Sequence, residues 1–222
     1  MNKPLQLIGI SGKRGAGKSA VADILQYKCG YHHPDVHILN FADPLKAVCA
    51  TLEDPEAPYE PLLSYYEQEG KAKPSGLLGL TRGELLQSVG QALRDKHPTI
   101  WVDVTMKAAR ALLSGIDDQQ LVVVADIRYP NEADAIKAAG GILIRVVGDP
   151  MNQRGDGTRD DTHPSETALD DYPGFNVVLY NTGDKAELTE LVQKSLAAIN
   201  ERLSRNKRVL FDIGTPSGVH GR

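Results

Sequence analysis

The chain has 222 residues, of which 41% are hydrophobic and 24% are charged, and its formal net charge is −4. This composition supports one domain, or one domain with a small insert, and its acidic balance gives no overall positive field, so no nucleic-acid partner is expected. Cys29 and Cys49 lack metal-ligand spacing and suit a reducing compartment. Because no signal peptide or membrane-spanning run is visible, a soluble cytoplasmic protein with no membrane partner is expected.

The hydrophobic pattern predicts strands that alternate with helices in chain order. The predicted strands cover residues 5–10, 36–41, 121–126, 142–148 and 175–181. The predicted helices are one after the glycine-rich loop that ends at Gly30, one from 42 to 52, and others over 81–96, 100–113, 131–139 and 185–203. Asp43 is the expected N-cap of the second helix, with Pro44 at its first helical position.

Two polar, turn-rich segments interrupt this order: residues 53–79, read as an irregular excursion, and residues 149–174, read as a flap. Residues 205–222 are predicted to form a disordered C-terminal tail. The alternation predicts an α/β fold in three α/β/α layers, with a central parallel sheet covered on both faces. Ligands are then expected at the carboxyl ends of the strands.

The segment GKRGAGKS fits the phosphate-binding pattern G-x-x-x-x-G-K-[ST] in full, between a predicted strand and a predicted helix. Its glycines let backbone N–H groups face the phosphates, and the helix N-terminus adds a favourable dipole. Lys18 can reach the β- and γ-phosphates, while the Ser19 hydroxyl can ligate Mg²⁺. The alternative is a glycine-rich turn that matches by chance. The candidate ATP-binding residues are Gly12, Lys13, Arg14, Gly15, Ala16, Gly17, Lys18 and Ser19.

The rest of the chain narrows the class of nucleotide-binding protein. The Asn-Lys-x-Asp guanine motif of GTPases is missing from the sequence, and large ATPases need more chain for coupling. A short chain with polar inserts that could close over a second substrate favours a small-molecule kinase.

The segment ADIRYPNE follows the most strand-like run of the chain. Asp126 could hold the Mg²⁺ shell directly or through water, and Arg128 could grip a phosphate with its guanidinium. Glu132 could orient Arg128 or receive a substrate group. The alternative is a salt bridge between Arg128 and Glu132 that serves only the fold.

The flap and the helical pair before it carry further candidates. Arg154 and Arg159 could meet the charge on a transferring phosphate, or could belong to a solvated loop. His163 could instead belong to a capping segment in which Ser165 is the N-cap. Trp101 could stack on a base, although the core is its better assignment from sequence.

Four segments, FADPLK, ELLQSVGQALRDKHPTIWV, ADIRYPNEADAIKAAGG and DDTHPSE, occur in this order in bacteriophage-type deoxynucleoside monophosphate kinases. The sequence resembles that family up to about residue 200. The resemblance implies an adenylate-kinase-like P-loop core, with an insert that binds the nucleoside monophosphate (NMP) and a lid. The implied single kinase domain spans 1–204: the core is 1–42, 119–148 and 175–204, the insert about 43–118, and the lid about 149–174.

The same resemblance implies transfer of the ATP γ-phosphate, with Mg²⁺, to deoxynucleoside monophosphates (dNMPs) for DNA synthesis. It implies small nucleotide partners and, if a phage encodes the protein, a location in the host cytoplasm. A homodimer is left open. The implied catalytic residues are Lys18, Arg128, Arg154 and Arg159, and Asn181 and Gly183 are expected near the adenine of ATP. The implied acceptor-binding residues are Asp43, Lys46, Arg82, Gln87, Arg94, Trp101, Arg128, Glu132, His163 and Glu166.

Two departures from the family pattern are visible. Many phage members have Asp-Thr after the P-loop lysine, whereas this chain has Ser19 and Ala20, which restores the common form of the motif. The arginine before ELLQ, Arg82, is displaced by one residue. The alternatives to a dNMP kinase are another small P-loop kinase, acting on a coenzyme precursor, a ribonucleotide or a polynucleotide 5′ end, and a nucleotide-binding protein without turnover.

Overall fold

The computed structural model describes residues 6–27, 36–55, 66, 70–114, 120–152, 154 and 161–204, of which 200–204 are described as backbone only. The chain divides into two compact units. The first consists of Met1–Leu39 and Ala109–Arg222, and the second of Asn40–Ala108. Cys29, Arg159, the predicted tail and residues 56–65 of the predicted excursion lie outside the described residues.

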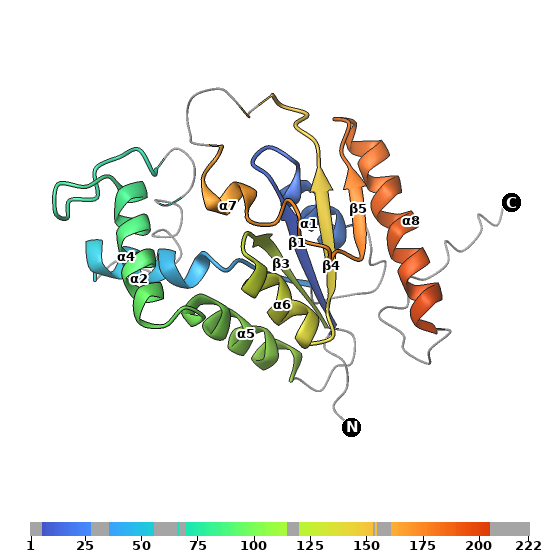
Figure 1. The fold of residues 1–222 in the computed structure, drawn as a ribbon, viewed down its shortest axis with the longest axis horizontal. Coiled ribbons are helices and arrows are strands. Elements are labelled where there is room, and N and C mark those ends of the chain that lie inside the picture. The colour runs from blue at the N-terminus through green and yellow to red at the C-terminus, as the bar shows by residue number, and fades with distance from the viewer. Residues whose placement is uncertain are drawn as a thin grey trace, which may run out of the picture. The chain divides into compact units, whose positions relative to one another are not determined.

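The first unit is built on a parallel sheet (Figure 1). Its strands are β1 (Leu7–Gly12), β2 (Val36–Leu39), β3 (Leu121–Ile127), β4 (Ile142–Val147) and β5 (Val177–Tyr180). They lie in the order β2-β3-β1-β4-β5, and each neighbouring pair is parallel. The prediction of an α/β fold with a central parallel sheet is therefore confirmed.

Helices cover both faces of this sheet. Ile8 and Ile10 of β1 share a core with α1 (Lys18–Tyr27) and α8 (Lys185–Ser204). Gly9 faces the other way, where a Cβ would overlap Ile127 and press against Ile136 of α6 (Pro130–Ala138). Because successive residues of a strand point to opposite faces, α6 covers the face opposite to α1 and α8. Figure 1 shows α6 in front of the strands and α1 behind them.

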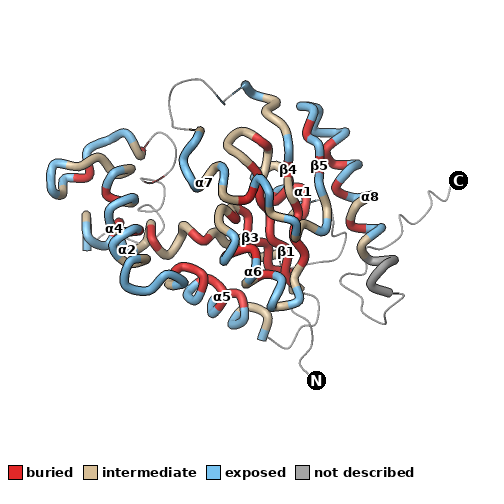
Figure 2. The backbone as a smooth tube through the Cα atoms, in the orientation of Figure 1, coloured by how far each residue is buried: buried red, intermediate tan, exposed pale blue. Residues whose placement is uncertain are grey.

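The apolar strand runs are explained by this double cover. Every residue of β1 is buried, as is nearly all of β3, and Figure 2 shows buried residues concentrated along the central strands. A strand that is buried on both faces reads as a continuous hydrophobic run rather than an alternating one. β1 continues through Ser11 and Gly12, whereas the sequence analysis ended it at Ile10.

The second unit is helical. It contains α2 (Asp43–Glu53), α4 (Arg82–Lys96) and the part of α5 (Ile100–Leu113) up to Ala108. Its apolar core gathers around two aromatic side chains, Tyr66 and Trp101. Residues 70–80 form turns, with an isolated antiparallel bridge between Pro74 and Thr81.

Two predicted helix caps are wrong. The N-cap of α2 is Ala42, and Asp43 is the first helical residue, whose carboxylate accepts hydrogen bonds from the backbone and side-chain N–H groups of Asn40. In the flap, α7 (Pro164–Thr167) is capped by His163 rather than Ser165, because the His163 Nδ1 accepts the Ser165 N–H. Among the described helices, none combines the length and the apolarity needed to cross a membrane.

Candidate functional site

The glycine-rich loop that carries the P-loop sequence pattern, residues Gly12–Ser19, joins the end of β1 to the start of α1. Gly15 and Gly17 have positive φ angles of 73° and 97°, a conformation that glycine adopts without strain. A Cβ at Gly17 would overlap the Nδ2 atom of Asn181, so the loop also needs glycine there for close approach. The sequence pattern therefore produces the tight, curved backbone that phosphate binding requires.

Lys18 is folded back onto this loop. Its Nζ donates to the carbonyl oxygens of Gly12 at 2.9 Å and Lys13 at 3.0 Å. Burial, reinforced by the positive charge of Arg128, lowers the pKa of the Lys18 ammonium to about 7, while Glu166 and Asp126 act in the opposite direction. A bound phosphate would supply the negative charge that this ammonium needs, and would raise its pKa again.

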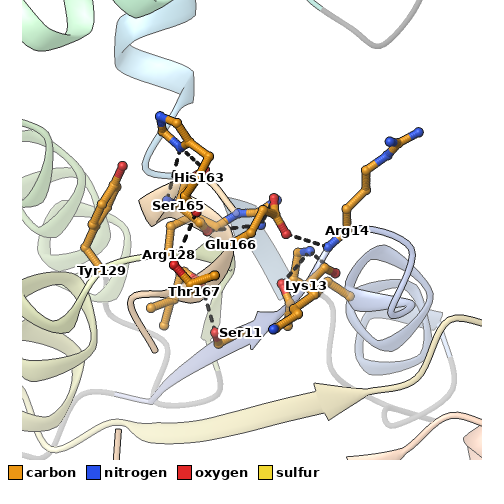
Figure 3. Close-up of polar contacts among 12 residues, drawn as sticks. Ser11, Lys13, Arg14, Arg128, Tyr129, His163, Ser165, Glu166 and Thr167 are labelled. Carbon is orange, nitrogen blue, oxygen red and sulfur yellow. Dashed lines mark hydrogen bonds and ion pairs between the residues drawn. The ribbon is translucent and has the colours of Figure 1, made fainter. Parts of the chain in front are cut away.

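Arg128, which follows β3, meets the flap at the P-loop (Figure 3). Its Nη1 donates to Glu166 Oε1 at 2.6 Å, and Glu166 Oε2 accepts the backbone N–H of Arg14 at 2.7 Å. The structure thus brings together Lys18, Arg128 and Glu166, three predicted site residues that are distant in sequence.

A second set of contacts lies beside the first. Asp170 pairs with Lys13 Nζ at 2.7 Å and with Arg145 Nη2 at 2.9 Å. Arg145 also donates to the Ser11 hydroxyl at 2.9 Å, and that hydroxyl donates to the carbonyl of Ile127 at 3.0 Å. These contacts place a second arginine next to the P-loop.

Glu132 acts on Arg128 through the backbone. Its carboxylate accepts the N–H groups of Arg128 at 2.7 Å and Tyr129 at 3.1 Å, which caps α6. The carboxylate of Glu132 is buried, with 4% of the residue exposed. Glu132 therefore fixes the turn that carries Arg128, and the guanidinium of Arg128 reaches Glu166.

Asn181 follows β5 and packs under the P-loop. Its Nδ2 donates to the Ala16 carbonyl at 3.0 Å, and its Oδ1 accepts the Gly183 N–H at 3.1 Å. Of the two residues expected near the adenine, Asn181 therefore contacts the P-loop, and Gly183 is hydrogen-bonded to Asn181.

Arg154 is the predicted lid arginine that lies within the described residues. Its backbone N–H and Nε contact Asp149 Oδ2 at 3.0 and 3.4 Å, and its Nη2 donates to the Gly148 carbonyl at 2.8 Å. The structure shows Arg154 tied to its own loop, just after β4.

The second unit holds the other predicted acceptor residues. Lys46 lies 3.5 Å from Asp43, and Arg82 Nε donates to Glu53 at 3.0 Å. Gln87 and Arg94 lie on α4, where Gln87 is exposed. Trp101 is 4% exposed, and its Nε1 donates to the Gly90 carbonyl. This burial agrees with the assignment of Trp101 to the core rather than to base stacking.

The comparison with known proteins connects this geometry to a family. The chain is 34% identical over 197 residues to a protein of Acanthamoeba polyphaga mimivirus named "Putative deoxynucleotide monophosphate kinase". The match covers 79% of this chain and 88% of that relative. This chain belongs to the deoxynucleotide monophosphate kinase family. No family model matches it. The comparison therefore confirms a deoxynucleotide monophosphate kinase family, whereas the bacteriophage-type subdivision that the four sequence segments indicated stays a prediction.

The donor set of this kinase-family chain fits Mg²⁺. Ser19 is exposed on the first turn of α1, and the negative charge of Asp126 acts on the Lys18 ammonium. Within the described part of the chain, no three His, Cys, Asp or Glu side chains gather into a metal cage. A hydroxyl, one carboxylate, waters and substrate phosphates are the ligands that Mg²⁺ typically takes in such proteins.

Arg145 and Asp170 were missed by the sequence analysis. One signal for Arg145 was available, because it is the only charged residue of ILIRVV, an otherwise apolar strand. Asp170 gave no such signal, because its flap segment contains several other acidic residues.

Proposed function

We propose that the protein is a bacteriophage-type kinase that transfers the γ-phosphate of ATP to a deoxynucleoside 5′-monophosphate, releasing ADP and the diphosphate. The observation that carries the proposal is the convergence of Lys18, Arg128 and Arg145 on a glycine-built P-loop. The family of the chain supports a deoxynucleotide as acceptor. The proposed partners are small nucleotides.

In this proposal the P-loop backbone and Lys18 bind the ATP phosphates, and Arg128 offsets charge on the transferring group. Phosphoryl transfer leaves little covalent work for the protein, so catalysis depends on positioning and on fixed positive charge. Mg²⁺, held by Ser19 and through water by Asp126, would supply further charge neutralisation when bound. The acceptor phosphate is largely ionised at neutral pH, so no general base is required.

The acceptor is assigned to the second unit, where Asp43, Lys46, Gln87 and Arg94 are the proposed contacts. Arg82 pairs with Glu53 and is largely covered, so it fits a supporting role better than direct contact with the acceptor. Arg154 and Arg159 are the proposed lid cations.

The test is a coupled ADP-release assay with ATP·Mg and each of dAMP, dGMP, dCMP, dTMP, AMP and GMP. We expect turnover with deoxy acceptors well above that with the ribonucleotides and the blank. Lys18→Ala should abolish turnover with an unchanged circular dichroism spectrum. The control variant Lys194→Ala should retain turnover, because the Lys194 side chain is 71% exposed and pairs only with Glu190 of the same helix among the contacts described. Turnover by Lys18→Ala, or none by the wild type with any acceptor, would contradict the proposal.

A further inference from the structure

Two carboxylates four residues apart join the flap to the P-loop. Glu166 bridges the Arg14 N–H at 2.7 Å and Arg128 Nη1 at 2.6 Å. Asp170 bridges Lys13 Nζ at 2.7 Å and Arg145 at 2.9 Å. Each carboxylate therefore connects the loop to an arginine that lies in a neighbouring strand, Arg145 in β4, or directly after one, Arg128 after β3.

The two bridges differ in their donors. Asp170 accepts a hydrogen bond from a lysine side chain, and its own side chain is 36% exposed. Water can replace either partner in such an exposed ion pair, so the pair contributes little. Glu166 is only 10% exposed and takes a backbone N–H of the P-loop together with a guanidinium (Figure 3). A backbone N–H beside a helix N-terminus, combined with a guanidinium, is a donor set that proteins use for phosphate oxygens.

We propose that the Glu166 carboxylate is an internal substitute for a nucleotide phosphate. It holds the Arg14 N–H and Arg128 while the site has no nucleotide, and a phosphate that takes these donors displaces it. Glu166 thereby sets how tightly the P-loop binds its ligand. This inference rests on the proposed function, since it assumes that the loop binds the phosphates of a nucleotide.

Competition by a charged group predicts a gain in affinity when the charge is removed. Gln at position 166 keeps the size of the side chain but offers only a neutral acceptor, and neutral hydrogen bonds are about half as strong as charge-assisted ones. Glu166→Gln should therefore bind inorganic triphosphate about fivefold more tightly than the wild type.

The test is isothermal titration of the full chain with inorganic triphosphate and with ADP·Mg. The matched control is Asp171→Asn, which removes one negative charge from an exposed residue of the same segment. We expect tighter binding by Glu166→Gln and a change below about twofold for Asp171→Asn, since distant surface charges are screened. Weaker or unchanged binding by Glu166→Gln, or equal tightening by both variants, would overturn the proposal.

Thermal unfolding separates this role from a purely structural one. Glu166→Gln should lower the melting temperature of the ligand-free protein and enlarge the shift that triphosphate produces. A lower melting temperature with an unchanged shift would identify Glu166 as structural and overturn the inference. A wild type that binds triphosphate without phosphorylating any dNMP would overturn only the proposed function, whereas a wild type that binds no triphosphate would overturn the inference.

Discussion

The charge state of Lys18 depends on the fold. In the folded protein the pKa of its ammonium is about 7, because the group is buried and Arg128 is near, whereas the unfolded chain keeps the ordinary value of about 10.4. Between these two values the unfolded chain binds more protons than the folded protein. The free energy of unfolding contributed by this group therefore rises as the pH increases from about 7 toward 10.

Replacing Lys18 by Met should remove this pH dependence. At pH 6 the wild type buries a charged ammonium. The free energy of unfolding of Lys18→Met, relative to that of the wild type, should therefore be highest at this pH. At pH 9 the free energy of unfolding of Lys18→Met relative to that of the wild type should be lower by about 3 kcal/mol than at pH 6. Urea unfolding at both pH values measures the difference, with Lys194→Met as the exposed control. An equal difference between variant and wild type at both pH values would contradict the lowered pKa.

Gly17 and Gly76 form a natural pair for testing the P-loop backbone. Both have positive φ angles, 97° and 71°, but a Cβ at Gly17 would overlap Asn181, whereas one at Gly76 has nothing within 4 Å. Gly76→Ala should cost about 1 kcal/mol from backbone strain alone. Gly17→Ala should cost about 1–3 kcal/mol more, because the Asn181 amide must leave the Ala16 carbonyl.

Urea unfolding of the double variant Gly17→Ala, Asn181→Ala checks the cause. If the extra cost arises from overlap, Gly17→Ala should be no more costly than Gly76→Ala once the Asn181 side chain is gone. An extra cost that persists in the Asn181→Ala background would assign it to the loop backbone instead.

At the scale of single residues, the sequence predicted those that belong to a contiguous motif. Lys18 and the loop glycines are specified by spacing alone, so the pattern finds them. Arg145 and Asp170 meet only because β4 and the flap come together, and no local pattern encodes that meeting.

At the scale of elements, a helix terminus explains Glu132, for which the sequence suggested a functional role. Its carboxylate caps α6. Glu84 makes the corresponding contact at the start of α4, where it completes a capping box with Thr81. The sequence left the role of Glu132 open between orienting Arg128, receiving a substrate group and forming a salt bridge with Arg128 that serves only the fold. The structure shows its carboxylate on two backbone N–H groups.

Arg82 has a structural role that can be measured separately from binding. The Glu53 side chain is 6% exposed, and its carboxylate accepts hydrogen bonds from Arg82 Nε at 3.0 Å and from the Tyr66 hydroxyl at 2.7 Å. The contact with Arg82 joins α2 to α4. Arg82→Met would leave a buried carboxylate without its cation, and should lower the free energy of unfolding by about 3 kcal/mol. The double variant Glu53→Gln, Arg82→Met removes the buried charge and keeps an acceptor for the Tyr66 hydroxyl, so it should recover most of this loss.

Chemical denaturation of these variants gives the comparison, with Arg110→Met on the exposed side of α5 as control. Because surface arginines contribute little, the control should stay within about 0.5 kcal/mol of the wild type. A loss below about 1 kcal/mol for Arg82→Met would show that the pair is solvated, and would leave Arg82 available for the acceptor.

At the scale of the whole molecule, the alternation of strands and helices was enough to predict a parallel sheet. The strand order β2-β3-β1-β4-β5 was not predictable, because strands buried on both faces are similar apolar runs that do not specify their neighbours. The division at Asn40–Ala108 is likewise a property of long-range contacts. The insert boundaries expected at about 43 and 118 remain a prediction about function.

The two units predict separate footprints for the two substrates. The P-loop, Arg128 and Arg145, which are proposed to bind the ATP phosphates, lie in the first unit. Lys46, Gln87 and Arg94, which are proposed to bind the acceptor, lie in the second. In hydrogen exchange, ADP·Mg should protect the amides of the P-loop and leave α4 unchanged, because a bound phosphate shields the N–H groups that it accepts from. Adding a dNMP should then protect α2 or α4. Protection by the dNMP confined to the first unit would contradict the assignment of the acceptor to Asn40–Ala108.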